Sequence, residues 1–254
     1  MHVALLESKL TCGAVVDSSV LGQPDVAEKL EQAQAVIALE FSADLLDDLS
    51  HGAASMALLQ VPGAGTDRID WDSLERYPQI AVCNAAGHEK AMAEYCMLAM
   101  LHHAHDFSEA SSSFRAGDWR MSGRGGGPLH HELSAATVGI LGLGAIGRAT
   151  AERAAAFGMR VLACNRTTDL TVPGLAEDAA IYPLSDLKGM AAQCDYLVLT
   201  SALAPETEGI LNETVIATMK PGAFLINVGR AGLADEQVRS CCFKPCSLCH
   251  GFFI

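Results

Sequence analysis

Residues 137–166, TVGILGLGAIGRATAERAAAFGMRVLACNR, decide the fold class of this chain. An apolar run at 138–141 predicts a buried strand, and it leads directly into GLGAIG at 142–147. An alanine-rich helix is expected over 148–157, followed by a second apolar strand over 159–164. A G-x-G-x-x-G placed between the strand and the helix of one βαβ unit predicts a dinucleotide-binding loop.

Each glycine of this motif has its own expected role. Gly142 permits a tight turn, Gly144 lets the backbone approach a pyrophosphate, and Gly147 lets the helix pack closely on the strand. Ala145 and Ile146 lie between these glycines, just before the expected helix, whose free N-terminal N–H groups suit phosphate oxygens. We therefore expect all five residues to contact a cofactor.

Composition favours a globular α/β protein. Half of the 254 residues are apolar and 19% are charged, which allows a substantial core. A formal net charge of −13 argues against nucleic-acid and anionic-membrane partners. No apolar run is long enough to cross a bilayer, and the N-terminus lacks the pattern of a signal peptide. The sequence thus predicts a cytoplasmic protein.

Strand-like and helix-like segments alternate along the chain, which predicts parallel sheets covered by helices on both faces. A flexible loop is expected at 122–128. The expected strands and helices outside 137–166 are strands at 2–7, 36–39, 57–61, 80–83, 196–200 and 224–228, and helices at 44–49 and 89–105.

Six blocks of sequence together resemble the D-isomer-specific 2-hydroxyacid dehydrogenases, over about residues 1–238. They occur in the order expected for that family. The blocks are PGAGTDRID at 62–70, NAAGHEKAMAEYCMLAML at 84–101, FRAGDW at 114–119, TVGILGLGAIGRA at 137–149, LAPETEGILNE at 203–213 and MKPGAFLINVGRAGLADE at 219–236.

The resemblance implies two α/β domains, a flavodoxin-like substrate domain and a Rossmann domain with a doubly wound parallel sheet. It also implies an oxidoreductase that transfers hydride between NAD(P)H and a small 2-keto or 2-hydroxy acid. We expect the substrate domain at 1–105 and the cofactor domain at 106–238. A homodimer is a further expectation.

Family motifs then assign roles to single residues. Arg230 matches the catalytic arginine, whose planar fork can clamp a carboxylate and polarise a keto oxygen. Ala64 and Gly65 match the loop whose backbone N–H groups hold the substrate carboxylate. The family's remaining cofactor contacts match Thr200, Val228, Gly229 and, more loosely, Asp235.

The choice of cofactor depends on the end of the second strand. A Rossmann unit that selects NAD usually carries an acidic residue about 20 residues after the glycines. Asn165, Arg166 and Thr167 occupy that place here. An arginine there can bind the 2′-phosphate, so we expect NADP, with NAD as the alternative.

The sequence departs from the family after Arg230. Family members place a carboxylate and an acid/base histidine well downstream, yet 24 residues follow Arg230 and the resemblance ends near Val238. We therefore expect a C-terminally truncated member with impaired activity. Its cofactor sheet is expected to have four strands, with the strand at 224–228 as an exposed edge. A non-catalytic nucleotide-binding or partner-binding relative and an unstably folded product are the alternatives.

Residues 239–254 form a cysteine-rich tail that holds four of the nine cysteines. We expect it to be unrelated to the rest, and we reject His250 as the acid/base because it is too close to Arg230 in sequence. A haem or zinc site in the tail is also rejected. The other five cysteines are expected to be buried thiols. His102, His103 and His105 are expected to be solvated at a helix end, so no metal site is predicted.

Overall fold

The computed structural model describes residues 33–43, 55–119, 130–170, 172, 180–235 and, as backbone alone, 249–253. Contacts divide the chain into unit 1, Met1–Ala86, and unit 2, Gly87–Ile254. The strand expected at 2–7, the helix at 44–49 and the loop at 122–128 lie outside the described residues.

Unit 1 contains a parallel sheet of three described strands. They are β1 (Ala35–Ile37), β2 (Leu58–Gln60) and β3 (Ala81–Cys83), and they lie side by side in chain order. This order matches the last three strands of the flavodoxin-like arrangement 2-1-3-4-5. The short helix α4 (Trp71–Leu74) begins at Asp70, whose carboxylate accepts a hydrogen bond from the Ser73 amide.

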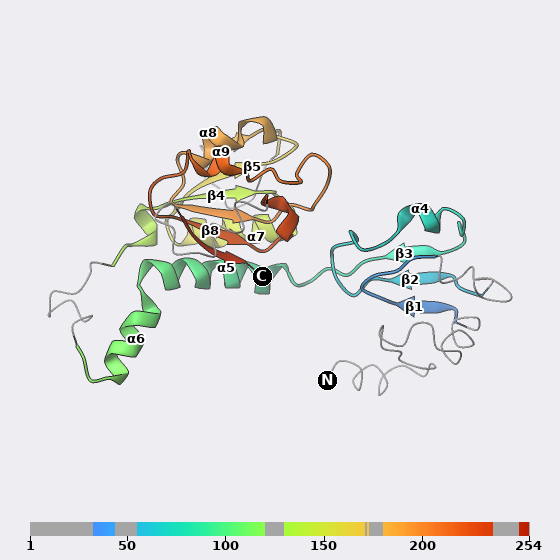
Figure 1. The fold of residues 1–254 in the computed structure, drawn as a ribbon, viewed down its shortest axis with the longest axis horizontal. Helices are drawn as coiled ribbons and strands as arrows, with labels where there is room; N and C mark the ends of the chain where they lie inside the picture. Colours follow the sequence, from blue (N-terminus) through green and yellow to red (C-terminus); the bar gives the residue numbers. More distant parts are fainter. Residues whose placement is uncertain are drawn as a thin grey trace. The chain divides into compact units, whose positions relative to one another are not determined.

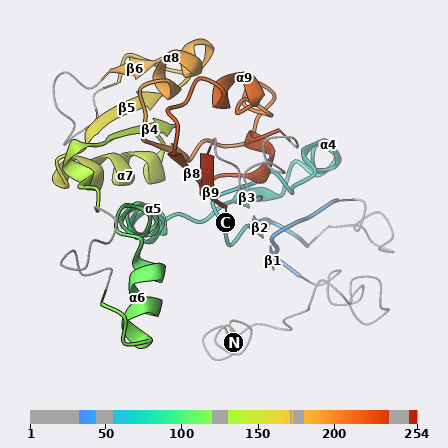
Figure 2. The ribbon, with the colours of Figure 1, turned by 60° about the vertical axis from the view of Figure 1, so that its left-hand side comes forward.

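Unit 2 is built on a six-stranded parallel sheet (Figures 1 and 2). Its order β6-β5-β4-β7-β8-β9 is the 3-2-1-4-5-6 order of a dinucleotide-binding fold. The strands are β4 (Thr137–Leu141), β5 (Arg160–Cys164), β6 (Ile181–Tyr182), β7 (Tyr196–Leu199), β8 (Ala223–Asn227) and β9 (Cys249–Phe253).

The expectation of a four-stranded sheet with an exposed edge is wrong. β9 comes from the cysteine-rich tail and pairs parallel to β8, with Cys249 opposite Ala223 and Phe253 opposite Asn227. An unpaired edge of β8 would expose a row of backbone N–H and C=O groups, and β9 supplies partners for them. The tail is thus not wholly unrelated to the fold. β6, at the opposite edge, was missed because two residues carry no periodicity.

Helices cover both faces of this sheet (Figure 1). On one face, α5 (Glu89–Ala104) and α7 (Ala145–Ala156) pack against a cluster that includes Ile140 and Val198. On the other face, α8 (Leu187–Ala191) and α9 (Glu213–Ile216) share a cluster with Leu141 and Leu199. Neighbouring strand residues face opposite ways, so each strand serves two cores.

Helix α5 belongs to unit 2, although we expected residues up to 105 to lie with the substrate domain. Its fully buried Cys96 and the fully buried Ala151 and Ala154 of α7 lie in one cluster. Small side chains let two helix backbones approach closely. Because α5 packs on α7 of unit 2, unit 1 ends at Ala86 and not at residue 105.

Helix α6 (Phe107–Arg115) follows α5 and was not predicted. It has no buried residue, and Phe107, Phe114 and nearby Trp119 are exposed. Three single turns, η3 (Leu133–Ala135), η4 (Leu184–Asp186) and η5 (Ala231–Leu233), complete the described elements. Among the described helices, none combines the length and the apolar character that a membrane span requires.

Candidate functional site

The glycine loop between β4 and α7 has the geometry that the motif predicts. Gly142 has φ +98°, and a Cβ there would lie 2.8 Å from the Ser201 amide nitrogen. A Cβ on Gly147 would collide with the Gly142 carbonyl oxygen. A Cβ on Gly144 would meet nothing within 4 Å, so open space lies above that residue.

The N-terminus of α7 faces this open space. Gly144 is the N-cap residue, and no side chain accepts a hydrogen bond from the first helical turn in the described structure. Uncapped N–H groups and the positive end of the helix dipole favour an anion. Ala145, Ile146 and Gly147 form that first turn, so the helix begins three residues before the expected start at 148.

Three side chains brace the loop. The Thr200 hydroxyl donates to the Gly142 carbonyl oxygen at 2.8 Å, and Arg148 Nε donates to the Leu143 carbonyl oxygen at 2.8 Å. Asn165 Oδ1 accepts from the Leu143 amide at 3.2 Å. These contacts fix the loop before any ligand binds.

A cleft of about 240 Å³ lies beside the loop at the carboxyl ends of the strands. Six predicted cofactor contacts line it together, namely Gly142, Gly144, Asn165, Arg166, Thr167 and Thr200. Residues that the sequence did not single out also line it: Leu143, Leu184, Ser201, Ala202, Ala204, Glu206 and Thr207. Leu143 belongs to the loop itself, whereas the other six are distant from it in sequence and come to lie beside it only on folding.

The end of β5 carries an ion pair. Arg166 Nη1 lies 2.8 Å from Glu206 Oε1, and the two side chains are 78% and 43% exposed. Asn165 Nδ2 donates to the Thr167 carbonyl oxygen at 2.9 Å. The LAPETEGILNE block contains Glu206, but only folding places it against Arg166.

The donor set of this cleft fits a dinucleotide. Open space above Gly144 and the uncapped helix match a pyrophosphate, and the residues after β5 match the adenosine ribose. A bound nicotinamide cofactor would supply the hydride chemistry, whereas the protein positions it.

Arg230 follows β8 at the same edge of the sheet and is held by Asn227. Asn227 is 2% exposed; its Nδ2 donates to the Arg230 carbonyl oxygen at 2.9 Å, and its Oδ1 accepts from the Gly229 amide at 3.0 Å. A Cβ on Gly229 would lie 2.8 Å from the Ser201 carbonyl oxygen. Asn227 was not predicted, although its place in INVGRAG is the available signal.

Val228 and Asp235, which were also predicted as cofactor contacts, form backbone hydrogen bonds with neighbouring segments. The Val228 amide donates to the Leu199 carbonyl oxygen at 3.1 Å, and the Asp235 amide donates to Leu211 at 3.1 Å. Neither residue lines the cleft beside the glycine loop.

Ala64 and Gly65 lie in unit 1, in the loop after β2. Asn84 Nδ2 donates to the Ala64 carbonyl oxygen at 2.9 Å, and the Ala85 amide donates to Gly63 at 3.0 Å. The segment after β3 thus holds this loop in place. Ala64 is exposed and Gly65 is half-buried, so their backbone groups can be reached.

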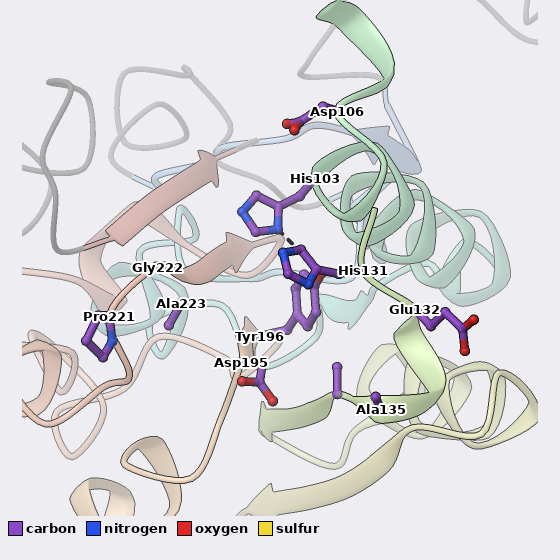
Figure 3. A pocket seen from close by; sticks show the side chains of 11 residues that line it. His103, Asp106, His131, Glu132, Ala135, Asp195, Tyr196, Pro221, Gly222 and Ala223 are labelled. Atoms are coloured by element: carbon purple, nitrogen blue, oxygen red, sulfur yellow. Dashed lines mark hydrogen bonds between the residues drawn. The ribbon is translucent and has the colours of Figure 1, made fainter. Parts of the chain in front are cut away.

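A second hollow, of about 500 Å³, lies at the amino ends of the strands (Figure 3). His103 and His131 line it with Tyr196. His103 packs on Phe224 with ring centroids 4.3 Å apart, and its Nδ1 lies 3.4 Å from the Tyr196 hydroxyl. His103 is therefore only partly solvated, because aromatic side chains of two strands lie against its ring.

The same hollow carries acidic residues, among them Asp195, which accepts from the Thr137 amide at 2.8 Å and pairs with Lys220 Nζ at 2.9 Å. Burial raises the pKa of Tyr196 to about 12, so its hydroxyl stays protonated. The described residues contain no metal-binding group of three or more histidine, cysteine or acidic side chains.

A family model described as "D-isomer specific 2-hydroxyacid dehydrogenase, NAD binding domain" matches residues 97–238. D-3-phosphoglycerate dehydrogenase of Methanocaldococcus jannaschii is 28% identical over 229 residues, which are 89% of this chain and 41% of that protein. The chain thus spans less than half the length of this relative.

Two solved structures have the same fold. An acyclic imino acid reductase in complex with NADPH and D-Arg has a TM-score of 0.73 at 24% identity, covering 91% of this chain and 71% of that one. D-Lactate dehydrogenase from Aquifex aeolicus, complexed with NAD and lactic acid, has a TM-score of 0.71 at 21% identity, covering 90% and 66%.

Proposed function

The chain belongs to the D-isomer specific 2-hydroxyacid dehydrogenase family, and from this premise we propose that it transfers hydride between a nicotinamide dinucleotide and a small 2-keto or 2-hydroxy acid. One observation carries the proposal. The braced glycine loop with its uncapped helix N-terminus and the clamped Arg230 stand at the same, carboxyl edge of one parallel sheet. Ligands of doubly wound sheets bind at that edge.

In this proposal Arg230 binds the substrate. Its guanidinium clamps the carboxylate of the acid and polarises the keto oxygen that receives the proton. Asn227 is the positioning residue, because it holds the backbone on both sides of Gly229. The backbone N–H groups of Ala64 and Gly65 hold the substrate carboxylate.

We propose NADP as the preferred cofactor, with NAD as the alternative. Arg166 and Thr167 line the cleft at the end of β5, where no carboxylate stands at positions 165–167. The arginine side chain is 78% exposed and so can reach a 2′-phosphate.

Turnover is proposed to be slow, because three histidines lie away from Arg230. His103 and His131 line the hollow at the amino ends of the strands, and His250 lies opposite Phe224, early in β8. The proton donor needed beside a keto oxygen is not among these three. This placement also favours the second candidate function, a nucleotide-binding protein without catalytic turnover.

Two measurements separate these functions. Titration of NADPH and NADH fluorescence measures binding, and absorbance at 340 nm with glyoxylate or hydroxypyruvate measures turnover. Binding with slow turnover supports the enzyme, and binding without turnover supports the second candidate. In an active chain, Arg230→Lys should lower kcat/KM by roughly 100-fold and leave dinucleotide affinity unchanged. Absence of binding contradicts both functions.

We further propose a homodimer that buries the apolar side of α6. Nine residues rarely form a stable helix in water without a packing partner, and α6 exposes Phe107 and Phe114. Light scattering should give twice the chain mass, and Phe114→Asp should give the monomer. A monomeric wild-type chain at micromolar concentration would contradict this proposal.

A further inference from the structure

We propose that Glu206 is a specificity-determining residue that restrains the preference for the 2′-phosphorylated cofactor. Its carboxylate occupies the place beside Arg166 that a 2′-phosphate needs, and it offers an acceptor to the 2′-hydroxyl of NADH. This inference rests on the proposed function, since it concerns the same cleft.

Among the described residues that line the cleft, Arg166 is the one basic side chain and Glu206 the one acidic side chain. Their charged atoms are 2.8 Å apart, although 40 positions separate the two residues in sequence. The carboxylate of Glu206 therefore stands where the charge of the cofactor is recognised.

A buried hydroxyl holds Glu206 in this place. Thr207 is 5% exposed, and its Oγ1 donates to the Ala202 carbonyl oxygen at 2.8 Å and accepts from the Ala204 amide at 2.9 Å. The Thr207 amide also donates to the Ala204 carbonyl oxygen. These bonds close the turn that carries Glu206, so its backbone is fixed before a cofactor binds.

Asn165 does not bind the ribose in this proposal, so Arg166 and Glu206 recognise it. It stands where NAD-selecting Rossmann units carry a carboxylate, but its two amide atoms bond the Leu143 amide and the Thr167 carbonyl oxygen. Glu206 brings a carboxylate to the same region from the loop after β7. The acidic residue missing at the end of β5 is thus replaced from across the cleft.

NADPH and NADH interact differently with the Glu206 carboxylate. A 2′-phosphate carries nearly two negative charges and binds the Arg166 guanidinium through strong paired hydrogen bonds. Glu206 competes for the same guanidinium and repels the phosphate. A 2′-hydroxyl is neutral and donates to a free oxygen of the Glu206 carboxylate. Glu206 consequently weakens NADPH binding and supports NADH binding.

The test compares Glu206→Gln with Glu208→Gln. Glu208 is exposed on the same turn and does not line the cleft, so its substitution makes the same change in net charge and in side-chain shape. Dissociation constants for NADPH and NADH are measured by fluorescence titration at low ionic strength, which requires no turnover. The ratio of the two constants is the readout.

Glu206→Gln should shift that ratio toward NADPH by roughly five- to tenfold, and Glu208→Gln by less than about twofold. An unchanged ratio in Glu206→Gln, or equal shifts in both variants, overturns the inference while leaving the proposed function intact. If the unsubstituted chain binds neither dinucleotide, the proposed function fails as well, and this result is distinct from the first.

Discussion

At the scale of single residues, Gly144 and Gly147 separate the folding role of the loop from its binding role. Position 147 must be glycine because the Gly142 carbonyl oxygen and the Thr200 hydroxyl occupy the space that a Cβ would fill. Position 144 must be glycine for another reason, since a pyrophosphate would lie in the open space where its Cβ would project. Its φ of −69° suits any residue, so the protein itself tolerates a side chain there.

Two alanine substitutions should therefore behave differently. Gly147→Ala should lower the free energy of unfolding by about 1–3 kcal/mol, because the added methyl group forces β4 and α7 apart, and should abolish dinucleotide binding. Gly144→Ala should abolish binding with stability unchanged. Urea unfolding and fluorescence titration measure both effects. A destabilised Gly144→Ala, or a fully stable Gly147→Ala, would refute this division of roles.

Buried thiols give the stability of the protein a pH dependence. Burial raises the pKa of Cys96 to about 11 and the pKa values of Cys164 and Cys194 to about 12. The unfolded thiols titrate near 8.5, so the unfolded chain releases protons first as pH rises. The free energy of unfolding should thus be unaffected by these groups below about pH 8 and should fall above it.

Urea unfolding at pH 7.5, 8.5 and 9.5 checks this sign. Cys194→Ala should reduce the slope of stability against pH, whereas Cys83→Ala, at an exposed position, should leave it unchanged. A flat profile up to pH 9.5 in the unsubstituted chain would contradict the burial of these thiols.

At the scale of elements, the α5–α7 contact decides where unit 2 begins. The contact is made of small side chains, and the fully buried Ala154 on α7 leaves no space for a larger side chain. Overpacking a tight interface displaces backbone. α5 therefore depends on α7 for its place, although it comes first in the chain.

Ala154→Leu should lower the free energy of unfolding by about 1–3 kcal/mol. Ala156→Leu is the matched control, because it makes the same change at an exposed position of the same helix. Thermal unfolding by circular dichroism compares the two variants. Equal melting temperatures would mean that α5 does not pack on this face of α7.

At the scale of the whole molecule, the cleft residues all come from unit 2. Ala64 and Gly65, which we propose to hold the substrate carboxylate, belong to unit 1. This division follows the doubly wound fold, in which one sheet provides the whole phosphate-binding edge.

Residues 87–254 expressed alone should bind a dinucleotide with a dissociation constant within about twofold of that of the full chain. They should show no turnover with any 2-keto acid, because the loop at Ala64 is absent. Fluorescence titration and absorbance at 340 nm measure these two properties. Loss of binding by a fragment that still folds, judged by circular dichroism, would show that unit 1 contributes to the cleft.

Local signals explain which parts of the fold and site were predictable. The motif at 142–147 lies within one βαβ unit, so the strand, turn and helix follow from residue order, although the bracing contact from Thr200 comes from a distant part of the chain. The pairing of β9 with β8 was not predictable in this way, because residues 249–253 are too few and too mixed to show a period. Site roles taken from the family, including that of Arg230, remain predictions.

By itself the sequence determined the dinucleotide-binding unit, the alternation of strands and helices, and the family. Only the tertiary structure decided that β6 and β9 complete the sheet, that α5 lies with unit 2, and that Glu206 meets Arg166. The physical reason is the sequence separation between the residues that interact. Turns and periodicity depend on neighbours a few residues apart, whereas a sheet edge, a helix interface and an ion pair across 40 residues exist only once the chain has packed.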